Sequence, residues 1–315
     1  MKKRAGNLLI LLLAFHLVVS NIFLLFGNAS PVVKVILNSL LITLACFGGL
    51  ALAFIKRNRR GEYGEFHIKR VGFLQIVLAF AFGAAIFYAL LQFNTAFQLF
   101  FEKTGADLTK QGGTIIPDLS QPVNLVISII AIAIMPAIFE ELFFRGVILY
   151  SWRDIKKNTA LMLTALLFTL THSTVLSYPS LFILGYFLAS ITYETKSIIP
   201  AIIIHFMNNL LSLLFAAFAN LGEEYISNSW ENILGHALIA VLAMAICAGI
   251  YLLIRKTARK QQAQVFPAET PSDSPEQTFE YLEHIEADEF PRTAVAAAIG
   301  VYSLFAIYSF ISLYL

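Results

Sequence analysis

The sequence predicts an all-α membrane protein: a polytopic transmembrane helical bundle of eight core helices followed by one extra C-terminal helix. Hydrophobic residues make up 58% of the 315 residues and charged residues only 13%, whereas soluble domains carry about 25% charged residues. The apolar residues gather in runs of about 20, the length that a helix needs to cross a hydrocarbon core about 30 Å thick. Composition and run length together exclude an ordinary soluble domain.

Nine apolar stretches are expected to be membrane helices. The first is longer than the apolar part of a signal peptide and lacks a convincing cleavage site, so we expect it to be retained. The sixth is short, and we expect it to be tilted, re-entrant or extended into its flanks. Pro136 lies inside the fourth stretch and is expected to open the helical hydrogen-bond ladder locally. The stretches are 6–27, 32–55, 71–100, 122–150, 159–176, 181–193, 198–220, 234–254 and 293–315.

Basic residues are concentrated in alternate loops. They precede the first expected helix and follow the second, fourth, sixth and eighth, whereas the other loops are mixed, uncharged or acidic. The positive-inside rule then places the N-terminus in the cytoplasm and, with nine spans, the C-terminus outside. Short loops with basic turns suggest the inner membrane of a bacterial cell. Glu194, at a helix end beside Lys196, is expected to be solvated.

Composition divides the chain into four segments. Residues 1–120 hold three membrane helices and an extracytoplasmic loop, 121–255 form the membrane core that carries the polar residues described next, 256–291 are a linker, and 292–315 form the last helix. The linker is rich in Pro, Ser, Gln and acidic residues, a composition typical of a solvated cytoplasmic tether. Cys46 and Cys247 both fall in apolar runs, so we expect buried thiols and no disulfide.

The fourth span contains two adjacent carboxylates, Glu140 and Glu141, together with Arg145. An ionised group at the bilayer centre costs at least about 2.5–3.5 kcal/mol, so such residues face the protein interior or water and usually have a function. Glu141 and Arg145 are spaced i, i+4 and can neutralise each other on one helix face. This pairing leaves Glu140 without a local partner.

Two other expected helices bring polar residues to a similar depth. The fifth carries His172, and the seventh carries His205 and Asn209, which are one helical turn apart. With a rise of about 1.5 Å per residue, Glu140, His172 and His205 would all lie roughly 10–20 Å from the cytoplasmic face. A single histidine in an apolar helix is usually a satisfied core residue. The matched depth, with the acidic pair present, favours a functional site instead.

These residue types suit amide hydrolysis inside the membrane. A carboxylate and an imidazole can hold a water, remove its proton and later protonate a leaving amine. A second imidazole and a carboxamide can donate hydrogen bonds to a developing oxyanion. Glu140, His172 and His205 could instead bind a divalent metal such as zinc, although the H-E-x-x-H signature is absent. Spacing alone leaves both mechanisms open.

Three ordered motifs resemble those of the CPBP family, the CAAX prenyl endopeptidases and bacteriocin-processing (Abi-type) intramembrane proteases. The resemblance covers about 120–215 and extends to about 255. It implies that Glu140 and His172 activate the water and that His205 and Asn209 form the oxyanion site. Many members of the family were first described as metalloproteases, and we favour the metal-free mechanism. The resemblance also implies supporting roles for the remaining motif residues. The motifs are Glu140-Glu141-x-x-x-Arg145, Phe168-x-x-x-His172 and His205-x-x-x-Asn209.

We therefore expect a hydrolase, an intramembrane endopeptidase that cleaves a peptide bond of a membrane-associated or lipidated peptide or protein. One alternative is a non-catalytic membrane immunity or scaffold protein. Another is a proton-coupled transporter that uses Glu140 and His172 as a proton relay. The expected partners are a peptide or protein substrate and the lipid bilayer, with no nucleic acid. The sequence does not reveal the physiological substrate or the oligomeric state.

Overall fold

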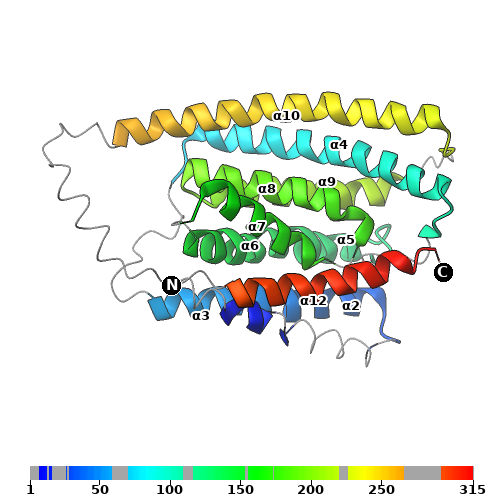
Figure 1. Ribbon diagram of the computed structural model, residues 1–315, viewed down its shortest axis with the longest axis horizontal. Coiled ribbons are helices and arrows are strands. Elements are labelled where there is room, and N and C mark those ends of the chain that lie inside the picture. Colours follow the sequence, from blue (N-terminus) through cyan, green and yellow to red (C-terminus); the bar gives the residue numbers. More distant parts are fainter. Residues whose placement is uncertain are drawn as a thin grey trace, which may run out of the picture.

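The computed structural model describes residues 7–12, 14–15, 26, 28–58, 70–108, 116–152, 155–172, 174–219, 226–265 and 292–314. Within these ranges every regular element is a helix, which confirms the all-α prediction. Seven helices are long and apolar enough to cross a membrane. The protein is therefore an integral membrane protein, and Figure 1 shows its helices packed side by side along one common direction.

Several of the membrane spans consist of consecutive helical segments with different winding. The first described span runs through α2 (Pro31–Asn38), the π-helix η1 (Ser39–Gly48) and α3 (Gly49–Asn58). The span with the acidic pair runs through α5 (Pro122–Ser128), η3 (Ile129–Ile134), α6 (Met135–Glu141) and η4 (Leu142–Leu149). The other helices are α4 (Phe73–Lys103), α7 (Lys157–Leu170), η5 (Val175–Ser177), α8 (Tyr178–Thr195), α9 (Ile199–Ala219), α10 (Trp230–Val265) and α12 (Arg292–Ile311).

The expected boundaries need correction around His172. The fifth stretch was expected to be helical over 159–176, but α7 ends at Leu170. The backbone N–H groups of Thr171 and His172 donate to Phe168 and Thr169, so the last turn tightens and the helix stops. The short sixth stretch is extended at its N-terminal side by η5, giving the 21-residue span Val175–Thr195.

Prolines mark several helix starts, as the missing N–H of proline would dictate. Pro31 begins α2 behind Ser30, whose hydroxyl caps the N–H of Val33, and Pro122 begins α5. Most of the expected first helix and residues 266–291 of the linker lie outside the described residues. α10 continues to Val265, so the beginning of the linker segment is helical. α12 matches the expected last helix.

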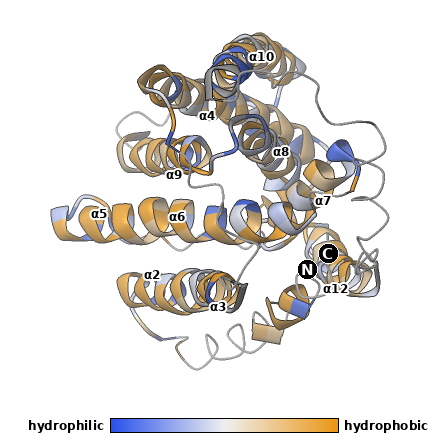
Figure 2. Ribbon diagram, turned by 90° about the vertical axis from the view of Figure 1, so that its left-hand side faces the viewer, coloured by the Kyte–Doolittle hydropathy of each residue, from blue (hydrophilic) through white to orange (hydrophobic). Residues whose placement is uncertain are grey.

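The helix with the acidic pair lies in the interior of the bundle. Figure 2 shows α5 and α6 between α2 and α3 on one side and α9, α8, α4 and α10 on the other. Every residue from Phe143 to Leu149 in η4 is buried. In contrast, large apolar side chains of α10 and α12, such as Val241 and Leu304, are 65% and 69% exposed. This outer apolar surface fits a lipid environment.

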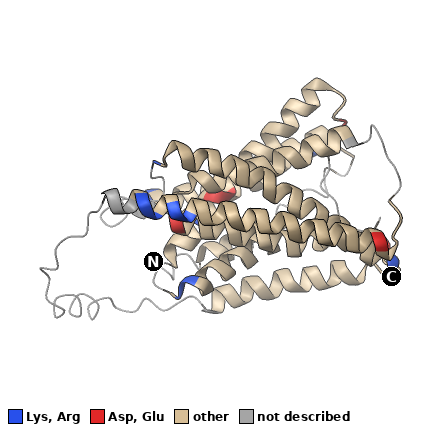
Figure 3. Ribbon diagram, turned by 90° about the horizontal axis from the view of Figure 1, so that it is seen from above, with Lys and Arg blue, Asp and Glu red and all other residues tan. Residues whose placement is uncertain are grey.

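One end of the bundle carries most of the basic residues (Figure 3). The start of α7, the end of α8 and the last turns of α10 meet there, because Glu194 contacts Lys157, Arg255 and Arg259. The expectation that Glu194 is solvated is therefore wrong: the residue is only 8% exposed. A carboxylate beside three cations is stabilised without water, and it fastens three helices together at this end. Cys46 and Cys247 are buried free thiols, as expected.

Candidate active site

The helix that carries the acidic pair is locally unwound at Pro136. Proline has no N–H to donate, and its ring clashes with the carbonyl four residues earlier, that of Ile132. The chain is wound as a π-helix over Ile129–Ile134, immediately before the α6 turn that contains Pro136, and again over Leu142–Leu149. The expectation that Pro136 opens the ladder is confirmed. Such π segments change the direction in which the following side chains point.

Asn209 contacts the backbone at this irregular point. Its Nδ2 donates to the carbonyl oxygen of Ile132 at 3.2 Å, across 77 residues of sequence. A backbone carbonyl inside a membrane is costly when it lacks a hydrogen-bond donor. Asn209 donates to the Ile132 carbonyl, to which Pro136 cannot donate because it has no N–H. The bond ties α9 to the helix of Glu140. His205, one turn before Asn209, is thereby held against the same helix.

Glu141 is the centre of a fully buried charged network. Its Oε1 accepts hydrogen bonds from Arg145 Nη1 at 2.7 Å and from His205 Nδ1 at 2.9 Å. The Glu141 and Arg145 side chains are 0% exposed and that of His205 is 3% exposed. The pairing of Glu141 with Arg145 is the one predicted from i, i+4 spacing. The bond to His205 was not foreseen, and it fixes the proton on Nδ1 of that ring.

Arg145 is also held by α8 and by an aromatic ring. Its Nη2 donates to the Gly185 carbonyl at 3.0 Å, and its guanidinium carbon lies 4.7 Å from the Phe168 ring centroid. A Cβ atom at Gly185 would lie 3.1 Å from the Phe168 ring and 3.2 Å from Ala165 Cα. Glycine therefore allows α7 and α8 to approach closely at this level. Arg145 thus connects the network to α8 and to the Phe168 ring.

The Phe168 ring packs against both candidate histidines. His172 meets it edge to face with a centroid distance of 4.9 Å, and His205 does so at 5.7 Å. His172 Nδ1 lies 2.9 Å from the Phe168 carbonyl oxygen and donates a hydrogen bond to it. In the neutral ring Nε2 is then the nitrogen that can accept a proton. His172 lies just beyond the end of α7, not within a helix as expected, yet it reaches the same ring as His205.

Glu140 and Glu141 each have a buried Oε2 without a hydrogen-bond partner among the described residues, but Glu140 also lacks the hydrogen bonds that Glu141 Oε1 accepts. Glu140 is 9% exposed. A buried carboxylate oxygen without a donor is costly. Arg145 and His205 offset this cost at Oε1 of Glu141, whereas Glu140 has no such donors among the described residues and can bind a water or a substrate group. The contrast supports the inference that Glu140 is the carboxylate available for chemistry.

The described residues contain no group of three His, Cys, Asp or Glu side chains placed to hold a metal ion. The set Glu140, His172 and His205, considered from the sequence, is therefore not assembled as a ready metal site. Both histidines use Nδ1 in hydrogen bonds to Glu141 or to a backbone carbonyl.

The comparisons with known proteins agree with the motifs. Residues 122–211 match the family model of the type II CAAX prenyl endopeptidases, Rce1-like. The matched segment extends from α5 into α9 and contains all three motifs. The resemblance to the CPBP family is confirmed, and the match supports a CAAX-type intramembrane endopeptidase. No curated protein and no solved structure matches the chain.

Proposed function

We propose that the protein cleaves a peptide bond of a membrane-associated or lipidated substrate with a water activated by Glu140 and His172. The observation that carries the proposal is the buried Glu140 carboxyl group, which makes no hydrogen bond within the described residues, beside Glu141, whose Oε1 accepts from Arg145 and His205. The family match over 122–211 supplies the reaction class. Glu140 removes one proton from the water while the water oxygen attacks the scissile carbonyl carbon. His172 accepts a hydrogen bond from the same water through Nε2.

The tetrahedral intermediate then needs hydrogen-bond donors for its oxyanion. Asn209 uses one N–H of its carboxamide for Ile132 and retains a second one. His205 can donate from Nε2 only as an imidazolium, because its Nδ1 proton is directed at Glu141. The Glu141 carboxylate contacts this ring, so a negative charge would lie beside the imidazolium when the oxyanion develops. The carbon–nitrogen bond breaks as Glu140 gives its proton to the leaving amine.

The substrate is a peptide or protein that reaches the site from the membrane. The basic end of the bundle faces the cytoplasm by the positive-inside rule, with the N-terminus on the same side. Along the helix, Glu140 lies roughly 15 Å from this end at about 1.5 Å per residue. We infer a bacterial inner-membrane location from the same loop charges. A scissile bond near a lipid anchor or near a membrane helix end satisfies this depth.

The test compares new protein termini in membranes from cells that express wild type, Glu140→Gln or the control Glu231→Gln at equal levels. Glu231 is an exposed carboxylate in the first turn of α10, remote from the site in the sequence and the fold. We expect termini that occur with wild type and the control but disappear with Glu140→Gln. Persistence of those termini in Glu140→Gln would exclude Glu140 as the base.

A second arm repeats the cleavage in purified membranes with a strong divalent-metal chelator. Continued cleavage is expected if Glu140 and His172 activate the water without a metal. Loss of cleavage that zinc restores would replace the metal-free mechanism by a metal-dependent one. Identical termini in all three strains would instead favour a non-catalytic immunity or scaffold function.

A further inference from the structure

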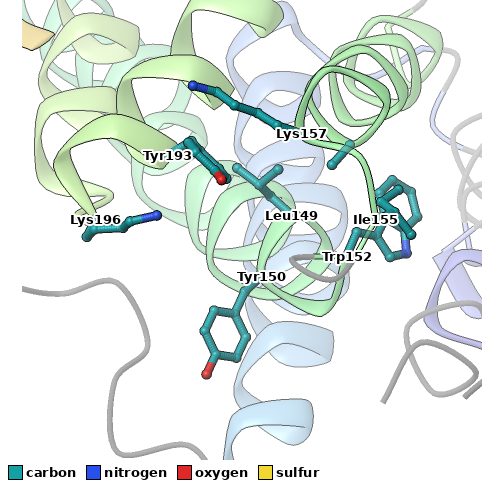
Figure 4. A pocket seen from close by; sticks show the side chains of 8 residues that line it. Leu149, Tyr150, Trp152, Ile155, Lys157, Tyr193 and Lys196 are labelled. Atoms are coloured by element: carbon teal, nitrogen blue, oxygen red, sulfur yellow. The ribbon is translucent and has the colours of Figure 1, made fainter. Parts of the chain in front are cut away.

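A cavity of about 110 Å³ lies at the basic end of the bundle, away from the candidate active site (Figure 4). It is formed where η4 ends, α7 begins and α8 ends. Its lining combines Lys157 and Lys196 with the aromatic residues Tyr150, Trp152 and Tyr193. A single water needs about 10–15 Å³ on a comparable measure, so the cavity has room for a larger polar group. None of the proposed catalytic residues contributes to it.

Two lysines share one aromatic ring in this cavity. Lys196 Nζ lies 4.0 Å and Lys157 Nζ 4.5 Å from the Tyr193 centroid. Figure 4 shows the Tyr193 ring between the two ammonium ends. The two nitrogens are therefore at most 8.5 Å apart, the sum of both distances. At physiological salt the Debye length is about 8 Å, so the two charges still repel each other and jointly attract an anion.

Lys196 has an unusual backbone conformation. With φ at 54°, it is the one non-glycine residue with positive φ in the described part of the chain. It ends α8 in the left-handed conformation, a position at which glycine or asparagine is usually found because a Cβ atom is disfavoured there. Glycine would relieve this strain. What lysine adds is an ammonium group beside Tyr193 at the rim of the cavity.

Among the described residues, positive charges outnumber negative charges around the cavity. Glu194 is the acidic residue next to this site, and its carboxylate already contacts Lys157, Arg255 and Arg259. Within the described part of the chain, one negative charge therefore faces three positive ones. The paired Glu194 stabilises the arrangement without neutralising it. An anion in the cavity would be attracted by the remaining positive charge.

We propose that this cavity binds the phosphate-bearing headgroup of an anionic membrane lipid. Tyrosine prefers the membrane–water interface, and the basic end of the bundle places Tyr150 and Tyr193 at that level, whereas Trp152 is fully buried. Basic pockets between membrane helices on the cytoplasmic side suit anionic headgroups. A lipid is already concentrated at this interface, unlike a free phosphate ion or a peptide carboxylate of the same charge chemistry.

The test uses the purified full-length protein in detergent and measures binding of phosphatidylglycerol and phosphatidylcholine by native mass spectrometry. Wild type is expected to retain phosphatidylglycerol at least about fivefold better, the effect of one lysine at a charged membrane surface. Lys196→Gly should lose this preference while its melting temperature stays equal or rises, because the strained backbone is relaxed. The control is Lys256→Gln, which removes another exposed lysine at this end of the bundle. Glutamine is chosen because glycine would destabilise the interior of α10.

Lys196→Gln provides a second variant that removes the charge without changing the backbone preference to that of glycine. An equal preference of wild type for both lipids, or an unchanged preference in Lys196→Gly and Lys196→Gln, would overturn the proposal. Inorganic phosphate or a short peptide with a free carboxyl terminus is added in separate arms. Displacement of phosphatidylglycerol by either at low concentration would assign the site to that ligand instead of a lipid. Because binding is measured directly, the result does not depend on proteolytic activity.

Discussion

Replacing Arg145 by methionine tests the buried network most directly. Arg145 and Glu141 are 0% exposed and 2.7 Å apart, so methionine leaves the Glu141 carboxylate with His205 as its one remaining partner in the network. Removing one member of a buried ion pair costs about 3–5 kcal/mol, because the other charge stays buried and uncompensated. The bond to the Gly185 carbonyl is lost as well. We expect Arg145→Met to be strongly destabilised.

The double variant Glu141→Gln/Arg145→Met identifies the cause of that loss. Without the Glu141 charge, no uncompensated carboxylate remains, so we expect the double variant to recover at least about 2 kcal/mol relative to Arg145→Met. The assay is unfolding of the purified proteins in mixed detergent, followed by the change in helical circular dichroism. The control Glu140→Gln/Arg145→Met should recover less, because Glu140 is not hydrogen-bonded to Arg145.

A double variant as unstable as the sum of the two single variants would refute this reasoning. Arg145 would then act through Gly185 and Phe168 instead of through Glu141. The recovered double variant should still lack cleavage, since His205 has lost the carboxylate that holds its ring. Stability and activity are thus expected to separate in one protein. If the network had only a structural role, the double variant would recover both stability and cleavage.

Three further variants probe the contacts around the network and the basic end. Gly185→Ala places a Cβ atom 3.1 Å from the Phe168 ring and 3.2 Å from Ala165 Cα, so unfolding should become easier by about 1–3 kcal/mol; an unchanged unfolding midpoint would contradict the close packing. Phe168→Ala should lower the free energy of unfolding by about 3–5 kcal/mol, because it leaves a cavity. Phe168→Leu should retain most of the stability but less of the cleavage rate, because both histidines lose their contact with the aromatic ring. Glu194→Gln should lower the melting temperature, and added salt should restore part of it by screening three cations; a salt-independent loss would argue against charge repulsion.

Much of the fold was predictable because bilayer thickness fixes the length of each apolar run. The spans, the added last helix and the interior position of the acidic pair follow from hydropathy and from the cost of burying charge. The Glu141–Arg145 pair follows from helical spacing, since both residues are on one helix. The unwinding at Pro136 follows from the missing N–H. Each of these features depends on residues that are close in the sequence.

Contacts between helices were not predictable from the same information. Apolar residues surround a membrane helix on all sides, so hydrophobic periodicity says little about its rotation. The sequence therefore could not show that His205 faces Glu141, 64 residues earlier, or that Asn209 faces Ile132. The end of α7 at Leu170 and the burial of Glu194 depend on tertiary contacts too. The spacing of His205 and Asn209 did indicate that both point to one side of α9.

Two roles are proposed for Asn209, one in positioning α9 and one in catalysis, and a double-mutant cycle with Pro136 can separate them. As a positioning residue it satisfies the Ile132 carbonyl beside the proline, and as an oxyanion donor it contacts the substrate through its second N–H. Asn209→Ala alone should cost about 1–3 kcal/mol of stability, the cost of leaving a buried carbonyl unsatisfied, and should abolish cleavage. Alanine at position 136 restores an N–H within the helix. In the Pro136→Ala background, the stability cost of Asn209→Ala should therefore shrink or vanish.

Cleavage in the four proteins of the cycle then distinguishes the two roles. If stability recovers in Pro136→Ala/Asn209→Ala but cleavage does not, and Pro136→Ala alone is active, the lost contribution is the hydrogen bond to the oxyanion. If both recover, Asn209 acts only by holding α9 against the helix of Glu140. If the stability cost is the same in both backgrounds, the bond at 3.2 Å does not compensate for Pro136. The first result is the one we expect, because a carboxamide has two N–H donors and Ile132 accepts only one of them.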